Sequence, residues 1–109
     1  MKILVLHLSL LFLSFSINAK QVFLGPSNNS QEEIQEALID LEPGDILTLK
    51  PGEYFFEDGL SLDIDDVIFE GSGIDETILN FENQMSGAQG LLVTSNGVTI
   101  RDFAVLDAK

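Results

Sequence analysis

The stretch SQEEIQEALIDLEPGDILTLKPGEY, residues 30–54, decides the fold. Its first half predicts an amphipathic helix over residues 31–41, which Pro43-Gly44 ends. Its second half predicts a strand at residues 46–49, a Pro-Gly turn, and another strand from Tyr54 onward. A single helix before a run of short strands predicts a lid on the first coil of a stacked structure.

The helix prediction rests on the spacing of apolar residues and on its first residues. Ile34, Leu38 and Leu41 follow the i, i+4, i+7 spacing of one helical face. We expect Ser30 to be the N-cap and Glu33, three residues later, to complete a capping box. One face of this helix is therefore apolar and must cover another part of the molecule.

The rest of the chain consists of short apolar segments separated by turns. Strands are expected at residues 21–25, 46–49, 54–56, 60–64, 67–69, 77–81, 91–94, 98–100 and 103–106. Such short strands agree with an antiparallel sandwich or with a coiled parallel solenoid. Residues 59–69 align with residues 90–100 at a constant offset of 31. Without most of the loop at residues 82–89, this repeat approaches the length of one coil of three strands, and such a recurrence favours the solenoid.

These segments resemble the amino-terminal start of right-handed parallel β-helix proteins of the pectate-lyase-like superfamily. The resemblance is carried by the helix with residues 43–54, by GSGIDETIL at residues 71–79, and by NGVTIRDF at residues 96–103. It implies an all-β solenoid, namely a right-handed parallel β-helix of about three coils with an amino-terminal capping α-helix.

The first 19 residues have the layout of a secretory signal peptide. Lys2 precedes an apolar run over residues 3–15, and Ala19 is a small residue at the expected cleavage site. The apolar run is short for a bilayer span of about 20 residues. We therefore expect a leader at residues 1–19, export to the periplasm or the medium, and no permanent membrane anchor. Residues 20–109 would form the cap and first coils of a β-helix domain that continues in a longer protein.

Charge and residue content exclude several classes of function. The 109 residues carry 18 Asp and Glu against 5 Lys and Arg, a net charge of -13, which disfavours nucleic acid as a partner. Cysteine is absent, so thiol catalysis and disulfides are excluded. The single histidine, His7, lies in the expected leader, so the mature chain would have no imidazole for acid–base chemistry or metal binding.

No catalytic, cofactor-binding or metal-binding residue is assigned from the sequence. Asp63, Asp65 and Asp66 could offer oxygen ligands to calcium, but a solvated corner of the chain explains them better. The adjacent carboxylates Glu57-Asp58 and Asp75-Glu76 are expected to serve turn solubility, since neighbours on a strand point to opposite faces.

Three further features allow a functional interpretation. Arg101 could act as a base by analogy with the family, although pairing with a nearby acid such as Asp102 explains it as well. The aromatic residues 54–56 could form a platform for stacking a sugar, but their position favours core packing beside the helix. Asn28-Asn29-Ser30 is formally an acceptor sequence for N-glycosylation.

The resemblance implies a protein that acts on or binds acidic polysaccharide as a lyase, epimerase or hydrolase, with catalytic groups on later coils. The alternative is a non-enzymatic surface or adhesive β-solenoid module. Both agree with the sequence, and neither indicates a particular cofactor.

Overall fold

The computed structural model describes residues 19–108. The predicted signal peptide therefore lies, apart from Ala19, outside the described residues. Among those residues, the elements along the chain are β1 (Gln21–Leu24), α2 (Ser30–Asp40), β2 (Ile46–Leu49), β3 (Gly52–Phe55), β4 (Leu60–Leu62), β5 (Ile68–Glu70), β6 (Thr77–Asn80), β7 (Leu91–Val93), β8 (Thr99–Arg101) and β9 (Ala104–Leu106). The predicted helix and strands are thus confirmed, with ends that shift by one or two residues.

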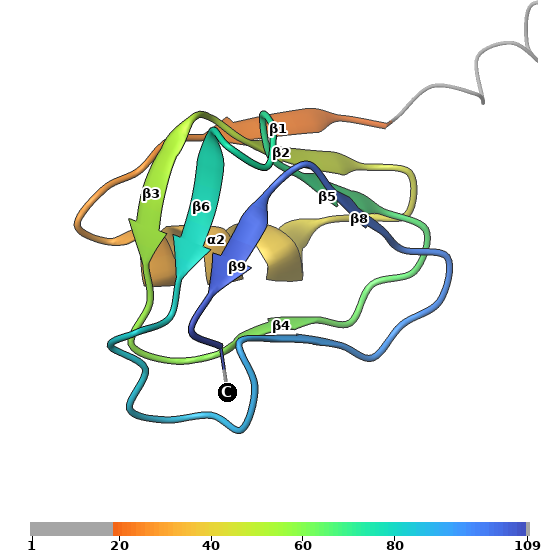
Figure 1. Cartoon of the computed structure of the whole chain (residues 1–109). Coiled ribbons are helices and arrows are strands. Elements are labelled where there is room, and N and C mark those ends of the chain that lie inside the picture. Colours follow the sequence, from red (N-terminus) through yellow and green to blue (C-terminus); the bar gives the residue numbers. More distant parts are fainter. Residues whose placement is uncertain (1–18, 109) are drawn as a thin grey trace, which may run out of the picture.

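The strands form three sheets in which every pairing is parallel. The sheet orders are β1-β2-β5-β8, β3-β6-β9 and β4-β7. From β2 onward the chain enters the three sheets in rotation, so each strand lies beside the strand three places later (Figure 1). This order is compatible with a β-solenoid and excludes the antiparallel sandwich.

The register of the strands confirms the internal repeat read from the sequence. Leu60 is opposite Leu91 and Phe69 is opposite Ile100, which is the offset of 31 residues. Between β2 and β5 the offset is only 22, from Ile46 to Ile68. The loop between β6 and β7 accounts for most of the difference, and the turn between β5 and β6 accounts for the rest.

The core lies between the sheets and one face of the helix. Side chains that alternate inward along the strands are fully buried, among them Leu47, Tyr54, Leu62 and Phe69. Each fully buried large apolar side chain contributes roughly 1.5–3 kcal/mol to folding. The predicted apolar face of α2 is confirmed, because its residues Ile34 and Leu38 are buried in the same cluster.

The start of α2 differs from the predicted capping box. Ser30 is the first helical residue, and its hydroxyl group donates to the carbonyl of Ser27 at 3.1 Å. Glu33 accepts a hydrogen bond from the hydroxyl of Ser27 at 2.9 Å and does not return to Ser30. The turn before the helix thus uses Ser27, which the sequence motif does not include.

Helix α2 also satisfies the free edge of β4. The side-chain amide of Gln35 accepts from the Ser61 N–H at 2.9 Å and donates to the Ser61 carbonyl at 3.0 Å, as a neighbouring strand would. One turn earlier, the Gln31 oxygen accepts from the backbone N–H groups of Glu57 and Asp58. Unpaired strand edges invite association with other chains, and Gln35 occupies this edge of β4 at Ser61.

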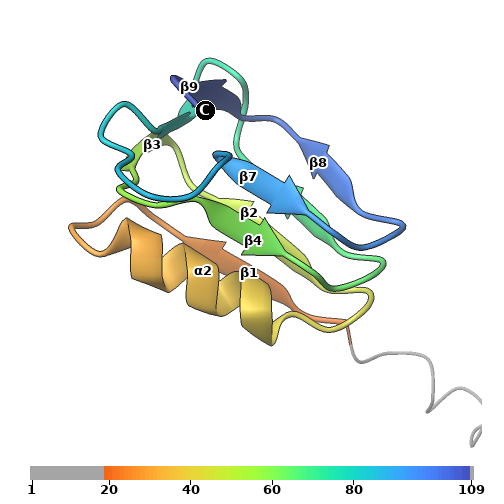
Figure 2. The ribbon, with the colours of Figure 1, turned by 90° about the horizontal axis from the view of Figure 1, so that it is seen from below.

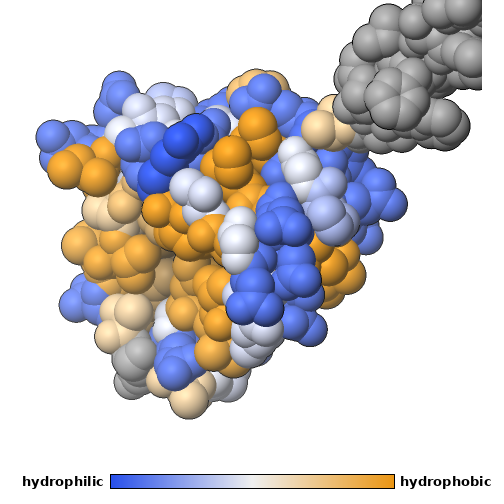
Figure 3. Space-filling model, turned by 90° about the vertical axis from the view of Figure 1, so that its right-hand side faces the viewer, coloured by the Kyte–Doolittle hydropathy of each residue, from blue (hydrophilic) through white to orange (hydrophobic). Residues whose placement is uncertain are grey.

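The opposite end of the molecule is apolar and uncovered in the part of the chain that the structure describes. Figure 2 shows α2 on one side of the stack and β8 and β9 on the other. In the space-filling view, hydrophobic atoms gather on the left, the end at which β7, β8 and β9 lie (Figure 3). Val93 shares its register with the buried Leu62, as predicted, yet 36% of Val93 is exposed because, within residues 19–108, no strand follows β7 in its sheet.

Candidate functional site

The three aspartates considered for calcium hold the turns of the chain together. Asp63 accepts from the Thr94 hydroxyl at 2.9 Å, and Asp65 accepts from the Asn96 N–H at 2.8 Å. Asp66 has a backbone φ of 60°, a left-handed conformation that Asp tolerates better than most residues. Within residues 19–108, no three His, Cys, Asp or Glu residues are grouped for metal binding.

Arg101 forms an ion pair with a strand neighbour. Its Nη2 and Nε lie 2.8 and 3.0 Å from the same carboxylate oxygen of Glu70, while Asp102 lies 3.6 Å from Nε. The Thr48 hydroxyl and then Arg101 lower the pKa of Glu70 below its ordinary value. The predicted ion pair is confirmed, with Glu70 rather than Asp102 as its principal acid.

The aromatic residues 54–56 divide between core and surface. Tyr54 is buried and donates to the Lys50 carbonyl at 2.6 Å, and burial raises the pKa of Tyr54 to about 12. Phe56 is buried and stacks on Phe81 with ring centroids 4.7 Å apart. Phe55 points outward and is 49% exposed. The core prediction is correct for the first and third residues and wrong for Phe55.

The exposed ring of Phe55 belongs to a polar groove of about 240 Å³. The groove is lined by Ser27, Asn28, Gln31, Phe55, Phe56, Glu57 and Asn83. These residues come from the turn before α2, the first turn of α2, the end of β3 and the loop after β6. The arrangement combines one aromatic surface with amide, hydroxyl and carboxylate groups.

Hydrogen bonds hold the walls of this groove in place. The Gln31 amide binds the backbone of residues 57–59, and the Met85 N–H donates to the Glu57 carbonyl at 2.9 Å. The buried Gln84 side chain donates toward three carbonyl groups of its own loop, which fixes the segment that carries Asn83. The exposed amides of Asn28 and Asn83, by contrast, make no hydrogen bond in the described part of the chain.

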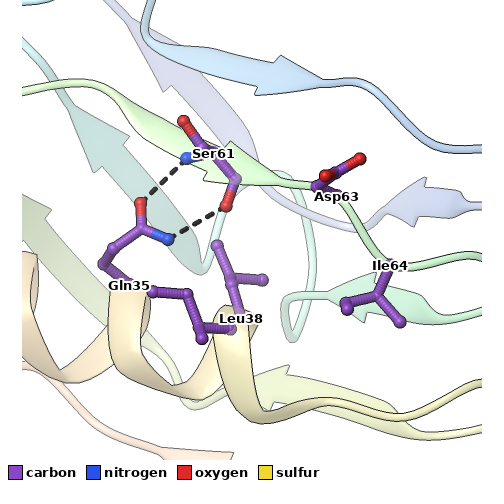
Figure 4. A pocket seen from close by; sticks show the side chains of 6 residues that line it. Gln35, Leu38, Ser61, Asp63 and Ile64 are labelled. Atoms are coloured by element: carbon purple, nitrogen blue, oxygen red, sulfur yellow. Dashed lines mark hydrogen bonds between the residues drawn. The ribbon is translucent and has the colours of Figure 1, made fainter.

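A larger hollow, of about 480 Å³, lies between α2 and β4. Figure 4 shows the Gln35 amide facing Ser61 through two hydrogen bonds, with Asp63 and Ile64 further along the chain. Its other lining residues, Leu38 and Ile39, are apolar. Because both the oxygen and the nitrogen of its Gln35 amide already bind β4, this hollow offers less chemistry than the groove at Phe55.

The amides of the Phe55 groove were not recognised in the sequence. Asn28 and Asn83 lie 55 positions apart, and no local pattern connects them. Alternation along the strand was the one available signal, since it places Phe55 on the face opposite Tyr54 and Phe56.

Two findings remain, one on membrane-spanning helices and one on similarity to known proteins. Among the described residues, no helix combines the length and apolar character needed to cross a membrane. The chain matches no family model, no curated protein and no solved structure.

Proposed function

We propose that the chain forms a right-handed parallel β-helix of the pectate-lyase-like superfamily, exported from the cell and capped by α2. The parallel pairing of all strands and their rotation through three sheets support this architecture. The superfamily assignment rests on the resemblance of the helix and residues 43–54 to its amino-terminal start, and of residues 71–79 and 96–103 to its coil motifs.

Within this architecture, the proposed function is polysaccharide binding at the groove around Phe55. The observation that carries the proposal is the half-exposed ring of Phe55 beside the unengaged amides of Asn28 and Asn83. An aromatic ring packs against the apolar face of a sugar, and amides donate to and accept from its hydroxyl groups. Sites of this kind combine an apolar surface with a few polar groups that fix orientation.

The groove favours binding over catalysis. Glycoside hydrolysis ordinarily uses two carboxyl groups about 5–9.5 Å apart across the sugar. Glu57 is the one carboxylate among the residues that line the groove. Arg101, the residue considered as a base, forms an ion pair with Glu70, and both residues lie in a different sheet from Phe55. The lyase, epimerase or hydrolase activity implied by the resemblance has no corresponding set of groups in this groove.

Retardation in native gels that contain polysaccharide tests this proposal. The chain is produced in a host without N-glycosylation, so that Asn28 stays unmodified, and is compared with Phe55→Ala. Phe23→Ala is the matched control, because Phe23 is similarly exposed (54%) but lies on β1 outside the groove. We expect Phe55→Ala to lose retardation and Phe23→Ala to keep it.

Absence of retardation by every neutral and acidic polysaccharide would contradict the proposed function, as would equal retardation of wild type and Phe55→Ala. Release of reducing ends or of ultraviolet-absorbing unsaturated product, with or without calcium, would show instead that this chain is an enzyme.

A further inference from the structure

We infer that the groove at Phe55 selects uncharged sugars and rejects uronates, an inference that rests on the proposed polysaccharide-binding function. It departs from the acidic polysaccharide that the family resemblance implies. Three features of the groove carry it: the charge of its lining, the kind of hydrogen-bonding groups it presents, and its size.

The lining carries negative charge and no positive charge. Glu57 is its only charged residue, and Glu33 lies at its border through the hydrogen bond to Ser27. The basic residues in the described part of the chain are Lys20, Lys50 and Arg101. None of them lines the groove.

The three basic residues are also placed on other parts of the molecule. Lys20 lies 4.0 Å from Asp45 and Arg101 lies 2.8 Å from Glu70. Lys50 precedes β3, whereas Phe55 ends it. A uronate carboxylate in the groove would therefore face Glu57 without a cation to compensate, and the net charge of -13 adds to the repulsion.

The hydrogen-bonding groups of the groove match hydroxyl groups. Each of the Asn28 and Asn83 amides presents both a donor and an acceptor, as does a sugar hydroxyl. The Glu57 carboxylate only accepts, and hydroxyl donors bind such a group through strong charge-assisted hydrogen bonds. A uronate carboxylate has no proton to donate to Glu57. It therefore cannot form the hydrogen bond that a hydroxyl group of a neutral sugar at the same position donates to Glu57.

The size of the groove limits the contact to a short part of a polysaccharide. Its volume of about 240 Å³ is below the roughly 300–1,000 Å³ typical of pockets for drug-sized ligands. One sugar unit can stack on Phe55 while the rest of the polymer passes outside. The charge of that single unit therefore decides whether the polymer binds.

Matched ligands that differ only in charge test the inference. Pectate and alginate oligosaccharides are compared by calorimetry with the same oligosaccharides after reduction of their carboxyl groups to alcohols, together with a neutral glucan oligosaccharide. At low salt we expect the tightest neutral ligand to bind at least about tenfold more tightly than the tightest uronate, a factor that corresponds to about 1.4 kcal/mol.

Variants assign the selectivity to Glu57. Glu57→Gln should raise the affinity for uronates and reduce the preference for neutral sugars, whereas Glu36→Gln, on an exposed part of α2 outside this groove, should leave the preference unchanged. Added salt should improve uronate binding to the wild type, because it screens like charges.

The possible results separate the inference from the proposed function. If uronates bind as tightly as neutral sugars and Phe55→Ala abolishes this binding, the inferred selectivity is wrong but the proposed binding site at Phe55 stands. An undiminished preference for neutral sugars in Glu57→Gln would also overturn the inferred selectivity. Failure of all five ligands to bind would overturn the proposed function itself.

Discussion

Glu70 joins three strands of one sheet through a single carboxylate. One of its oxygens accepts from the Thr48 hydroxyl on β2 at 2.8 Å, and the other accepts from Arg101 on β8. Gln21 on β1 extends this row by donating to Thr48 at 3.0 Å. Thr48, Glu70 and Arg101 are direct register partners on the outer face of the sheet, whereas Gln21 reaches Thr48 from two positions away along β1, so the row links all four strands.

The first prediction concerns the loss of this carboxylate. Hydrogen bonds from Thr48 and Arg101 lower the pKa of Glu70 in the folded protein below the ordinary value of 4.5. The resulting stabilisation is complete well above pH 4.5 and is lost as the pH falls through the lowered folded-state pKa. We expect Glu70→Gln to lower the free energy of unfolding by about 1 kcal/mol at neutral pH.

Urea unfolding at several pH values checks this prediction. The difference between wild type and Glu70→Gln should shrink as the pH falls from 4.5 through the lower pKa of the folded state, because Glu70 then becomes protonated in the wild type as well. Glu36→Gln serves as a control, since Glu36 is exposed on α2 and makes no side-chain hydrogen bond within residues 19–108. A difference that stays constant with pH would contradict the assignment.

Sequence patterns predicted single residues well wherever burial alternates along a strand. Tyr54 and Phe56 are buried as expected, and the error at Phe55 came from treating the three aromatic residues as one group. The capping box failed for a different reason. Ser27 lies outside the four-residue motif, yet its hydroxyl binds the Glu33 carboxylate that the motif assigns to Ser30.

At the scale of elements, α2 takes the place of a strand beside β4. Periodicity predicted the helix and its buried face, because both depend on neighbours within two turns. It did not predict that Gln35 would bind the edge of β4 and Gln31 the backbone of residues 57–59 before it. The two glutamines lie one helical turn apart on the polar side of α2, where a glutamine is ordinarily interpreted as exposed to solvent.

The second prediction is that Gln35 protects the β4 edge. Gln35→Ala removes the acceptor of the Ser61 N–H and the donor to the Ser61 carbonyl. We expect the Ser61 amide to exchange hydrogen at least about tenfold faster, in line with a local loss of about 1.4 kcal/mol. Hydrogen exchange followed by NMR measures this directly, with Glu36→Ala as the control on the same helix.

Removal of both glutamines should have a larger consequence. The double variant Gln31→Ala/Gln35→Ala exposes the edge of β4 at Ser61 and the backbone of residues 57–59 before it, so it should self-associate in sedimentation experiments at concentrations where the wild type does not. Unchanged exchange at Ser61 together with unchanged sedimentation would show that the amide contacts are incidental.

At the scale of the whole molecule, the 31-residue repeat is the feature that sequence and structure share most directly. It was legible in the sequence because the inward positions of paired strands repeat similar residues, such as Leu60 and Leu91. The number of coils and the handedness are part of the proposed architecture. Strands of three or four residues specify which strands pair more strongly than they specify how the chain passes from one sheet to the next.

A designed disulfide tests this register, and the chain has no cysteine of its own to interfere. Ser61 and Leu92 are direct partners on adjacent parallel strands, and both point outward. Neighbouring strands lie about 4.8 Å apart, within the roughly 4.4–6.8 Å between Cα atoms that a disulfide spans. We therefore expect Ser61→Cys/Leu92→Cys to oxidise to an intramolecular disulfide, detected by mass spectrometry after digestion without reductant.

Closing a loop of 31 residues should stabilise the fold by about 3–4 kcal/mol if native geometry is kept, which urea unfolding with and without reductant measures. Ser61→Cys/Thr99→Cys is the control pair, because Thr99 lies on β8 in a different sheet. A disulfide in the control pair, or its absence in the Ser61→Cys/Leu92→Cys variant, would contradict the parallel register. The proposed β-helix depends on that register, since each coil must place its strands directly beside those of the coil before it.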